Sequence, residues 1–429
     1  MYLDVRNIMV WNKKIFVYDF PVSIVDSWPQ KYSHHRLSVE ERFRSHFGAG
    51  ELIDETNAFY STHQYSLFTI FLERLRVSKY LTTSVEEADY FFIPYDIGMD
   101  SSTRESDGAL FQTNCPRLNN VTQLLKESVH FKKSNGNNHF LLHSINQMMI
   151  YYTNSNCQRL FELCFNCTKL SIDTYPPGIY PFLDDHTSMT HKWLSIPFPS
   201  NYHYNGKCIN PPWLVNTTIS QSDWFSTYSQ QRPYSVCFMG STKVTAKKQR
   251  QLRRKIIAHC NGLSKTLSAL SCLVIQLASH DSSTDILTIS LPNSKKTINP
   301  YSMCRFCLMP GGDFPTRKGF LDAMLAGCIP VTFQLIAAQY QWPHHWGSLQ
   351  TALDCSEYIP MEDMRRNTNH HLRALIDISV NATYLEKKLK CISNVGFRMQ
   401  YSLPLVQRRY PFNNELDAFD IAIEFILKG

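Results

Sequence analysis

The chain alternates short apolar runs with segments of helical periodicity. Between the first two runs, apolar residues from Tyr65 to Leu75 recur three or four positions apart, which is the spacing of one helix face. Strands that alternate with helices form parallel sheets covered on both faces. The first half of the chain is therefore predicted to be a parallel α/β domain. Its predicted strands lie near residues 15–19, 90–94, 139–143 and 193–197.

An irregular segment over residues 200–225 separates this pattern from a second one of the same kind. It contains Asn210-Pro-Pro-Trp213 and a Ser/Thr-rich stretch, which are typical of a connection between domains. After it, the pattern predicts a strand at residues 234–239, a helix over 246–259 and a strand at 286–291. The predicted units are a first domain over residues 1–225, a second domain over 226–400 and a C-terminal segment over 401–429.

The second domain contains a segment with strong local signals. The apolar run at residues 306–309 is interrupted by the Pro-Gly-Gly turn at 310–312. A short helix is predicted to follow, with Thr316 as its cap and Gly327 as its stop. Residues 329–333 then have the apolar composition of a buried parallel strand. The segment is predicted to fold as strand, glycine turn, helix and strand.

The charges of this predicted helix are unusual. Its first turn holds Arg317 and Lys318, although a helix N-terminus carries partial positive charge and favours acids. Two cations there suit an anion held by the free backbone N–H groups. Asp322, further along the helix, is placed to accept hydrogen bonds from a ribose. On these residues alone, an anion site and an ordinary solvated helix start are equally good interpretations.

The same segment strongly resembles the exostosin-like glycosyltransferase family. Two departures from the family pattern are Phe314, where a serine is usual, and Lys318, where a second arginine is usual. Lysine keeps the charge but loses the bidentate geometry that suits phosphate. The matching stretches are Phe306-Cys-Leu-Met-Pro-Gly-Gly-Asp313-Phe-Pro-Thr316-Arg317-Lys318 and Phe320-Leu-Asp322-Ala-Met-Leu-Ala-Gly327-Cys-Ile-Pro330-Val.

The resemblance extends over roughly residues 13–427, with poor matches at 100–130 and 150–190. Two further stretches, Ala338–Pro343 and Leu416–Ala422, are most similar to the branch that contains plant xyloglucan galactosyltransferases. Other matching stretches are Lys14–Pro21, Tyr60–Phe68, Glu87–Asp96, Asn138–Ser144 and Ser195–Pro199.

The resemblance implies a fold and an activity. The fold is α/β, with two Rossmann-like domains facing across a cleft, the GT-B type of glycosyltransferases. In that fold the second domain binds the nucleotide sugar, the first presents the acceptor, and the last helix crosses back onto the first domain. The implied reaction moves a sugar, galactose by branch resemblance, from a UDP-sugar to a hydroxyl of a glycan, with inversion. No Asp-x-Asp metal clamp occurs in the sequence, so a metal-independent reaction without a cofactor is expected.

The expected donor-binding residues follow the strand ends and the helix start of the second domain, where α/β sheets bind ligands. Cations at the helix start would stabilise the leaving diphosphate. The basic run from Lys243 to Lys255 is otherwise expected to be a solvated helix face. The predicted donor-binding residues are Gly240, Arg250, Arg254, Gly311, Gly312, Thr316, Arg317, Lys318 and Asp322.

Inversion requires one general base that deprotonates the acceptor hydroxyl. Asp96 and Asp313 rank first because each matches the family pattern beside a loop expected to border the cleft. His143 is a further candidate, although histidines in such positions are more often structural. Asp313 has an alternative role as an Asx-turn residue that holds the glycine loop. Asp19 and Asp100 also follow predicted strands.

Composition limits the other possibilities. The 429 residues, 43% of them hydrophobic, are enough for two domains with full cores. The net charge of +7 is concentrated between Lys243 and Lys255, so nucleic-acid binding is not indicated. Of the 13 cysteines, Cys164/Cys167 and Cys304/Cys307 form Cys-x-x-Cys pairs. Disulfides or buried thiols are favoured over a zinc site there.

No run of 18 apolar residues occurs, and residues 1–12 lack the apolar core of a signal peptide. By resemblance, we expect a Golgi-lumenal enzyme that is membrane-anchored in a longer form, and a complex with another glycosyltransferase is possible. Asn138 and Ser144 replace two acids of the family pattern, so an alternative is a pseudo-enzyme or glycan-binding partner. A dehydrogenase is disfavoured because no Gly-x-Gly-x-x-Gly follows the first strand.

Overall fold

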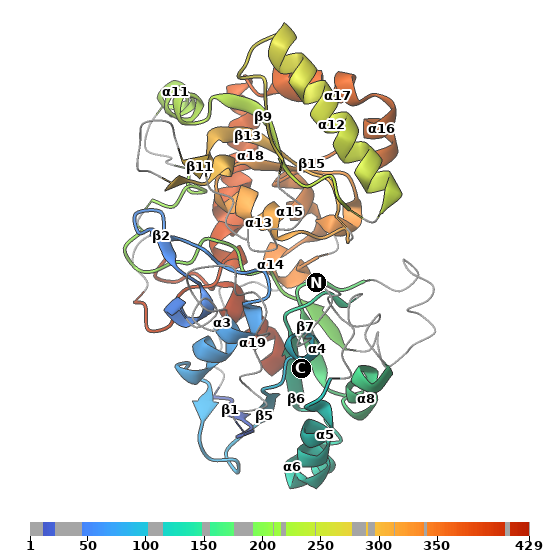
Figure 1. Cartoon of the computed structure of the whole chain (residues 1–429). Coiled ribbons are helices and arrows are strands. Elements are labelled where there is room, and N and C mark those ends of the chain that lie inside the picture. Colours follow the sequence, from blue (N-terminus) through green and yellow to red (C-terminus); the bar gives the residue numbers. More distant parts are fainter. Residues whose placement is uncertain are drawn as a thin grey trace.

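The computed structural model places two parallel sheets in separate halves of the molecule (Figure 1). Both sheets are flanked by helices, which confirms the predicted α/β class with two Rossmann-like domains. The structure describes residues 12–21, 45–101, 115–147, 155–175, 192–208, 210–215, 220–244, 246–276, 289–290, 297–312, 314–338, 341–407 and 412–428.

In the described part of the first domain, six parallel strands are ordered β4-β1-β5-β6-β7-β8. The four predicted strands are confirmed, while β4 and β7 were not predicted. The strands are buried because helices cover both faces, as expected for βαβ crossovers. Their bounds are β1 Ile15–Val17, β4 Leu81–Thr82, β5 Tyr90–Ile93, β6 His139–His143, β7 Thr168–Ser171 and β8 Trp193–Ser195.

The helix between β1 and β4 follows from the apolar spacing near Tyr65. Its residues Phe68, Phe71, Leu72 and Leu75 are buried, and Phe71 packs on Phe92 of the sheet with ring centroids 6.0 Å apart. The elements that surround this sheet are η1 Ser45–Gly48, β2 Leu52–Asp54, β3 Phe59–Tyr60, α3 Leu67–Arg76, α4 Ile97–Ser101, α5 Leu118–Glu127, α6 Val129–Ser134 and α8 Ser155–Leu163.

In the second domain, five described strands are parallel and ordered β10-β9-β13-β14-β15. The prediction that residues 286–291 form a strand of this sheet is wrong for the two of them that the structure describes. Ile289–Ser290 pairs antiparallel with Thr297–Ile298, and the edge strand of the sheet is Cys272–Gln276. The strands are β9 Tyr234–Gly240, β10 Cys272–Gln276, β11 Ile289–Ser290, β12 Thr297–Ile298, β13 Cys304–Met309, β14 Ile329–Thr332 and β15 Glu357–Tyr358.

The predicted strand–turn–helix–strand segment forms β13, α13 (Lys318–Leu325) and β14, and Gly327 ends the helix with a φ of +75°. The helix predicted at 246–259 is α12 and continues to Thr266. The remaining elements are α11 Gln221–Gln231, α12 Lys247–Thr266, η2 Pro300–Met303, η3 Leu335–Ala337, α14 Pro343–Trp346, α15 Leu349–Asp354, α16 Met361–Arg366, α17 Thr368–Ile378, α18 Ala382–Gly396, η4 Phe397–Met399 and α19 Ala418–Lys428.

The last helix, α19, lies against α3 of the first domain (Figure 1). Phe419 packs on Phe71 with ring centroids 4.9 Å apart, and Arg74 forms ion pairs with Asp417 and Asp420. At the other end of the second domain, α11 packs against α18, so the boundary predicted at residue 225 falls inside a helix of the second domain.

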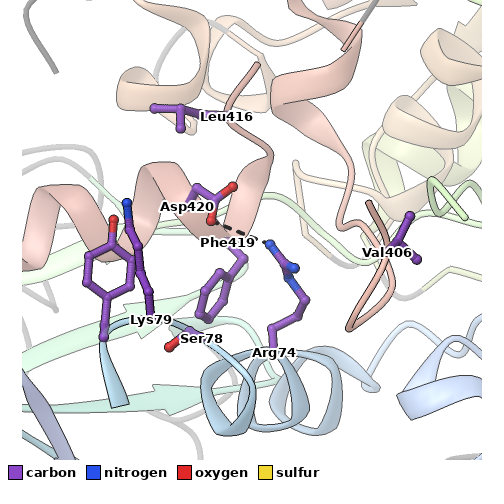
Figure 2. Close-up of a pocket in the computed structure, with 8 residues that line it drawn as sticks. Arg74, Ser78, Lys79, Val406, Leu416, Phe419 and Asp420 are labelled. Carbon is purple, nitrogen blue, oxygen red and sulfur yellow. Dashed lines mark hydrogen bonds and ion pairs between the residues drawn. The ribbon is translucent and has the colours of Figure 1, made fainter. Parts of the chain in front are cut away.

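A pocket of about 370 Å³ lies where α19 meets α3. Figure 2 shows Arg74 and Asp420 joined by an ion pair, with the ring of Phe419 beside Arg74. The guanidinium of Arg74 is therefore already neutralised by Asp420 of α19 and by Asp417, which directly precedes that helix. The lining residues are Arg74, Ser78, Lys79, Tyr80, Val406, Leu416, Phe419 and Asp420.

All 13 cysteines lie in the described residues, and ten of them form five disulfides. The two Cys-x-x-Cys pairs do not come together. Cys164 and Cys167 are buried thiols, whereas Cys304 and Cys307 each pair with a different distant cysteine. The disulfides join Cys115–Cys157, Cys237–Cys304, Cys260–Cys272, Cys307–Cys328 and Cys355–Cys391. Within the described residues, no helix combines the length and the apolarity needed to cross a membrane.

Candidate active site

The second sheet reverses its strand order between β9 and β13. From β9 the chain crosses to β10 on one side, and from β13 it crosses to β14 on the other. Sheets of this order bind ligands at the carboxyl ends of the two strands that flank the reversal. These ends are Gly240, at the end of β9, and the Pro310-Gly311-Gly312 turn after β13. The topology therefore brings two predicted glycine segments to one place.

Arg253 of α12 joins these two strand ends. Its guanidinium donates to the carbonyl oxygens of Pro310 and Gly311 at 3.3 and 2.9 Å, and also to the carbonyl of Ser241 after β9. It is 3% exposed and lies on the buried face of α12 with Leu252. Arg253 is thus a basic side chain that fixes both loops of the site.

The predicted arginines Arg250 and Arg254 lie elsewhere on α12. Arg250, three residues before Arg253, is partly buried, and Arg254, the residue directly after Arg253, is exposed. The signal that distinguishes them is periodicity, because the buried positions of α12 recur every three or four residues and include Arg253. Arg253 was not predicted because the basic run, apart from Arg250 and Arg254, was expected to be a solvated helix face.

Arg317 is the cation that points into the region between the strand ends. It is the extended residue before α13, and its guanidinium donates to the carbonyl of Pro310 at 3.0 Å. One guanidinium nitrogen lies 3.4 Å from the position that a Cβ on Gly240 would occupy. Burial lowers the pKa of Arg317, and no acid among the described residues forms an ion pair with it. The site therefore holds a partly buried positive charge without a carboxylate partner in the described part of the chain.

Lys318 is placed differently from Arg317. Its side chain is 8% exposed, and its ammonium lies 2.8 Å from a carboxylate oxygen of Asp322 and 2.6 Å from the amide oxygen of Asn201. The other oxygen of Asp322 accepts the backbone N–H of Asn201 at 2.8 Å. These three residues form a buried polar contact between the domains. The ribose role predicted for Asp322 and the diphosphate role predicted for Lys318 therefore compete with this contact.

Thr316 does not cap α13, so this prediction is wrong. The helix has Arg317 as its N-cap residue, without a side-chain capping bond. The Thr316 hydroxyl instead donates to a carboxylate oxygen of Asp173 at 2.6 Å. Asp173 follows β7 of the first domain and is fully buried. Asp173 was not predicted because β7 lies in the region of residues 150–190, which matches the family pattern poorly. The signal there was an acid directly after Thr168-Lys-Leu-Ser-Ile172, a short alternating strand.

The predicted catalytic residues of the first domain lie in different environments. Asp96, which follows β5, accepts the backbone N–H of Gly98 at 2.8 Å and that of Ser144 at 3.2 Å. Like Gly240, it lies at the carboxyl edge of its sheet, where the strand order reverses between β1 and β5. Asp313 lies outside the described residues. Gly311 and Gly312 lie beside Arg253, and their predicted role in donor binding stays a prediction.

His143 is buried in the core of the first domain. Its ring packs against Phe161 and Trp193, and its two nitrogens have no hydrogen-bond partner among the described residues. Burial lowers its pKa to about 3. A general base must reach the proton that it removes. A fully enclosed ring cannot do this, so the structure does not place His143 for that role.

The two replaced acids of the family pattern have ordinary structural contacts. Asn138 lies before β6, at the edge of the sheet opposite to the strand ends described above, and donates to the carbonyl of Asp89 at 3.0 Å. The Ser144 hydroxyl accepts the backbone N–H of Phe68 at 2.9 Å. Neither replacement touches the residues at the reversal of the second sheet.

Comparisons with known proteins agree with this geometry. The chain matches the Exostosin GT47 domain over residues 10–367. It is 23% identical over 390 residues to "Probable xyloglucan galactosyltransferase GT15" of Arabidopsis thaliana, covering 88% of this chain and 72% of that protein. It is also 23% identical over 376 residues to "Xyloglucan galactosyltransferase MUR3" of the same plant, covering 86% of this chain and 53% of that protein.

Among solved structures, the chain aligns with WaaG, a glycosyltransferase involved in lipopolysaccharide biosynthesis, with a TM-score of 0.36 and 10% sequence identity. That alignment covers 85% of this chain and 95% of the other. The assignment of a family rests on the domain match, which spans most of the sequence and includes both sheets. The chain belongs to the exostosin GT47 family, and its two Rossmann-like domains have the GT-B arrangement of glycosyltransferases.

Proposed function

We propose that the protein transfers galactose from UDP-galactose to a hydroxyl of a polysaccharide, with inversion and without a metal ion. The observation that carries this proposal is Arg317. It is a partly buried cation at the strand reversal of the second sheet, and no described acid neutralises it. A nucleoside diphosphate is the anion that sheets of this type bind at such a place.

The diphosphate would lie between Gly240 and the N-terminus of α13. Gly240 has no side chain to fill the space beside Arg317, and the first N–H groups of α13 are not capped by a side chain of the described residues. Helix N–H groups and a guanidinium together stabilise a developing negative charge on the leaving diphosphate. Arg253 holds the two loops so that this geometry exists before the ligand binds.

The first domain would supply the acceptor surface and the base. Asp96 is the proposed base because it lies at the strand reversal of the first sheet, the corresponding position in that domain. We expect Asp96→Asn to abolish transfer while the affinity for UDP stays within about twofold of wild type. The change is isosteric, and the carboxylate of Asp96 accepts the backbone N–H groups of Gly98 and Ser144, which belong to the first domain. Loss of UDP affinity in this variant would assign Asp96 to folding of the loops.

Galactose is proposed from the relatives. Two of those named above are xyloglucan galactosyltransferases, and a third, "Xyloglucan-specific galacturonosyltransferase 1" of Arabidopsis thaliana, is 23% identical over 88% of this chain. Galactose and galacturonic acid differ only at C6, so donor choice is an experimental question within one site. The five disulfides suit an oxidising compartment, which supports a lumenal location for the enzyme.

The test is calorimetric titration of UDP into the purified protein, with Mn²⁺ and separately with EDTA. We expect micromolar affinity that EDTA does not change. A panel of UDP-galactose, UDP-galacturonic acid, UDP-xylose and UDP-arabinose with xyloglucan fragments then identifies the donor, and NMR of the product reports its anomeric configuration. Dependence of binding on Mn²⁺, or a retained configuration, would refute those parts of the proposal separately. Absence of UDP binding under both conditions would refute the donor site.

A further inference from the structure

Asp173 and Thr316 connect the first domain to the peptide that carries the diphosphate-binding arginine. Thr316 directly precedes Arg317, and its hydroxyl donates to Asp173 at 2.6 Å. Both side chains are buried, with Thr316 5% exposed and Asp173 not exposed. A hydrogen bond from a hydroxyl to a carboxylate is about twice as strong as one between neutral groups. The backbone just before α13 is therefore fixed by a residue of the opposite domain.

The carboxylate of Asp173 is itself held by three further donors. One oxygen accepts from the side chains of Asn146 and Tyr175, and the other accepts the backbone N–H of Gln147 at 3.0 Å. Asn146 also reaches the Thr316 hydroxyl at 3.4 Å. Asn146 and Gln147 follow β6, and Asp173 follows β7, so two strand ends of the first domain converge on Thr316. Both oxygens of Asp173 are therefore occupied, and the carboxylate is not exposed to solvent.

We propose that Asp173 is a positioning residue, which acts through Thr316 to hold Arg317 in the orientation that binds the diphosphate. The proposal rests on the function proposed above. It assigns to a first-domain residue a role in donor binding, which the division into donor and acceptor domains does not predict. A small displacement of a positioned group lowers the rate or affinity of an enzyme strongly, by as much as about 100-fold for 1 Å.

Three variants and one control separate this role from a purely structural one. Thr316→Val removes the hydroxyl at constant shape, and Thr316→Ser keeps it. In the wild-type protein, each oxygen of Asp173 accepts a hydrogen bond from an N–H group. In Asp173→Asn, the amide nitrogen therefore faces at least one N–H donor in either orientation of the amide. The matched control is Thr368→Val. Thr368 is a threonine buried to a similar degree, and its hydroxyl bonds to Met364 within one segment of the second domain.

The measurements are the UDP dissociation constant by calorimetry, the melting temperature without ligand, and the kcat and KM for the donor sugar. We expect Thr316→Val and Asp173→Asn each to weaken UDP binding by about tenfold or more. We expect Thr316→Ser to remain within about twofold of wild type. UDP binding by the double variant, Thr316→Val with Asp173→Asn, should be no weaker than in the more affected single variant, since both changes remove the same contact. Thr368→Val should leave UDP affinity unchanged even if its melting temperature falls.

Wild-type UDP affinity in folded Thr316→Val would overturn the inference and leave the proposed function intact. Equal losses of affinity in Thr316→Val and Thr316→Ser would also overturn it, because the hydroxyl would then not be the positioning group. If Asp173→Asn does not fold, the comparison of the two Thr316 variants still decides. If wild-type protein binds UDP under no condition, the proposed function fails, and the inference that rests on it fails with it.

Discussion

Replacing Arg317 separates its contribution to binding from its contribution to stability. The perturbation is Arg317→Gln, which removes the charge and keeps a polar side chain of similar reach. In the ligand-free protein, Arg317 makes one bond, to the carbonyl of Pro310, and has no acidic partner among the described residues. Removing it should therefore cost little stability. Its binding role, in contrast, requires the charge.

The expected magnitudes follow from these contacts. A hydrogen bond to a charged group contributes about 1.5–3 kcal/mol, so UDP affinity should fall by roughly 10- to 150-fold. Loss of the hydrogen bond to the Pro310 carbonyl lowers the free energy of unfolding by about 1 kcal/mol. Removal of an unpaired, partly buried charge offsets part of this loss. We therefore expect the melting temperature of the ligand-free variant to stay within about 3 °C of wild type.

The matched control is Arg305→Gln. Arg305 lies on β13 and, like Arg317, has its pKa lowered by burial. It donates to the carbonyls of Arg232 and Ser379, at 3.0 Å each, and these lie at the other end of the strand from the glycine turn. This variant should lose stability and keep its UDP affinity, the opposite of Arg317→Gln. Calorimetric titration and thermal melts measure both. Unchanged UDP affinity in Arg317→Gln, or the same losses in both variants, would refute the reasoning.

Three further outcomes test the fold around the site. Asp322→Asn should lower the free energy of unfolding by about 3–5 kcal/mol, because it leaves Lys318 charged and buried. Urea unfolding at pH 7 measures this loss, and adding Lys318→Met should restore part of it. Gly327→Ala should cost about 2 kcal/mol or more, since φ is +75° and a Cβ would lie 2.4 Å from a carbonyl oxygen; an unchanged melt would contradict this. Burial favours the neutral ring of His143 and lowers its pKa from 6.5 to about 3. The unfolded state therefore takes up a proton before the folded state does, so the contribution of the buried ring to folding stability is complete above pH 6.5 and is lost as the pH falls toward 3. His143→Leu should thus remove about 1.4 kcal/mol per pH unit from the acid dependence of unfolding, and it should keep transferase activity at pH 7.

Local patterns predicted most of the strands because each strand carries its own signal. The order of elements from β13 to β14 was predictable, although the cap of α13 was not, since apolar runs, glycines and a helix of eight residues follow one another directly. Strand β7 was missed because three of its four residues are polar, and one of these is a buried lysine. The segment at 286–291 has the composition of a strand. Composition does not specify a pairing partner, however, and its described residues pair outside the main sheet.

The site was predictable only where neighbours in sequence are neighbours in space. Gly311, Gly312 and Arg317 belong to one loop, and the sequence located them together. From the other domain, Asp173 reaches Thr316 of this loop and Asn201 reaches the helix α13 that follows it, each across more than 100 residues of sequence. Their positions depend on how the two sheets face each other, which no local pattern contains.

The two adjacent cations show how backbone conformation decides the fate of a charge. Lys318 is the first residue of α13, so the helix places Asp322, four residues later, beside its ammonium. Arg317 is one residue earlier and extended, with φ −148° and ψ 137°, so no helical spacing gives it an acid. This explains why lysine is tolerated where the family pattern has a second arginine. The position needs a single ammonium that joins Asp322 to Asn201, whereas the planar, bidentate geometry of arginine is needed one residue earlier, at the proposed diphosphate.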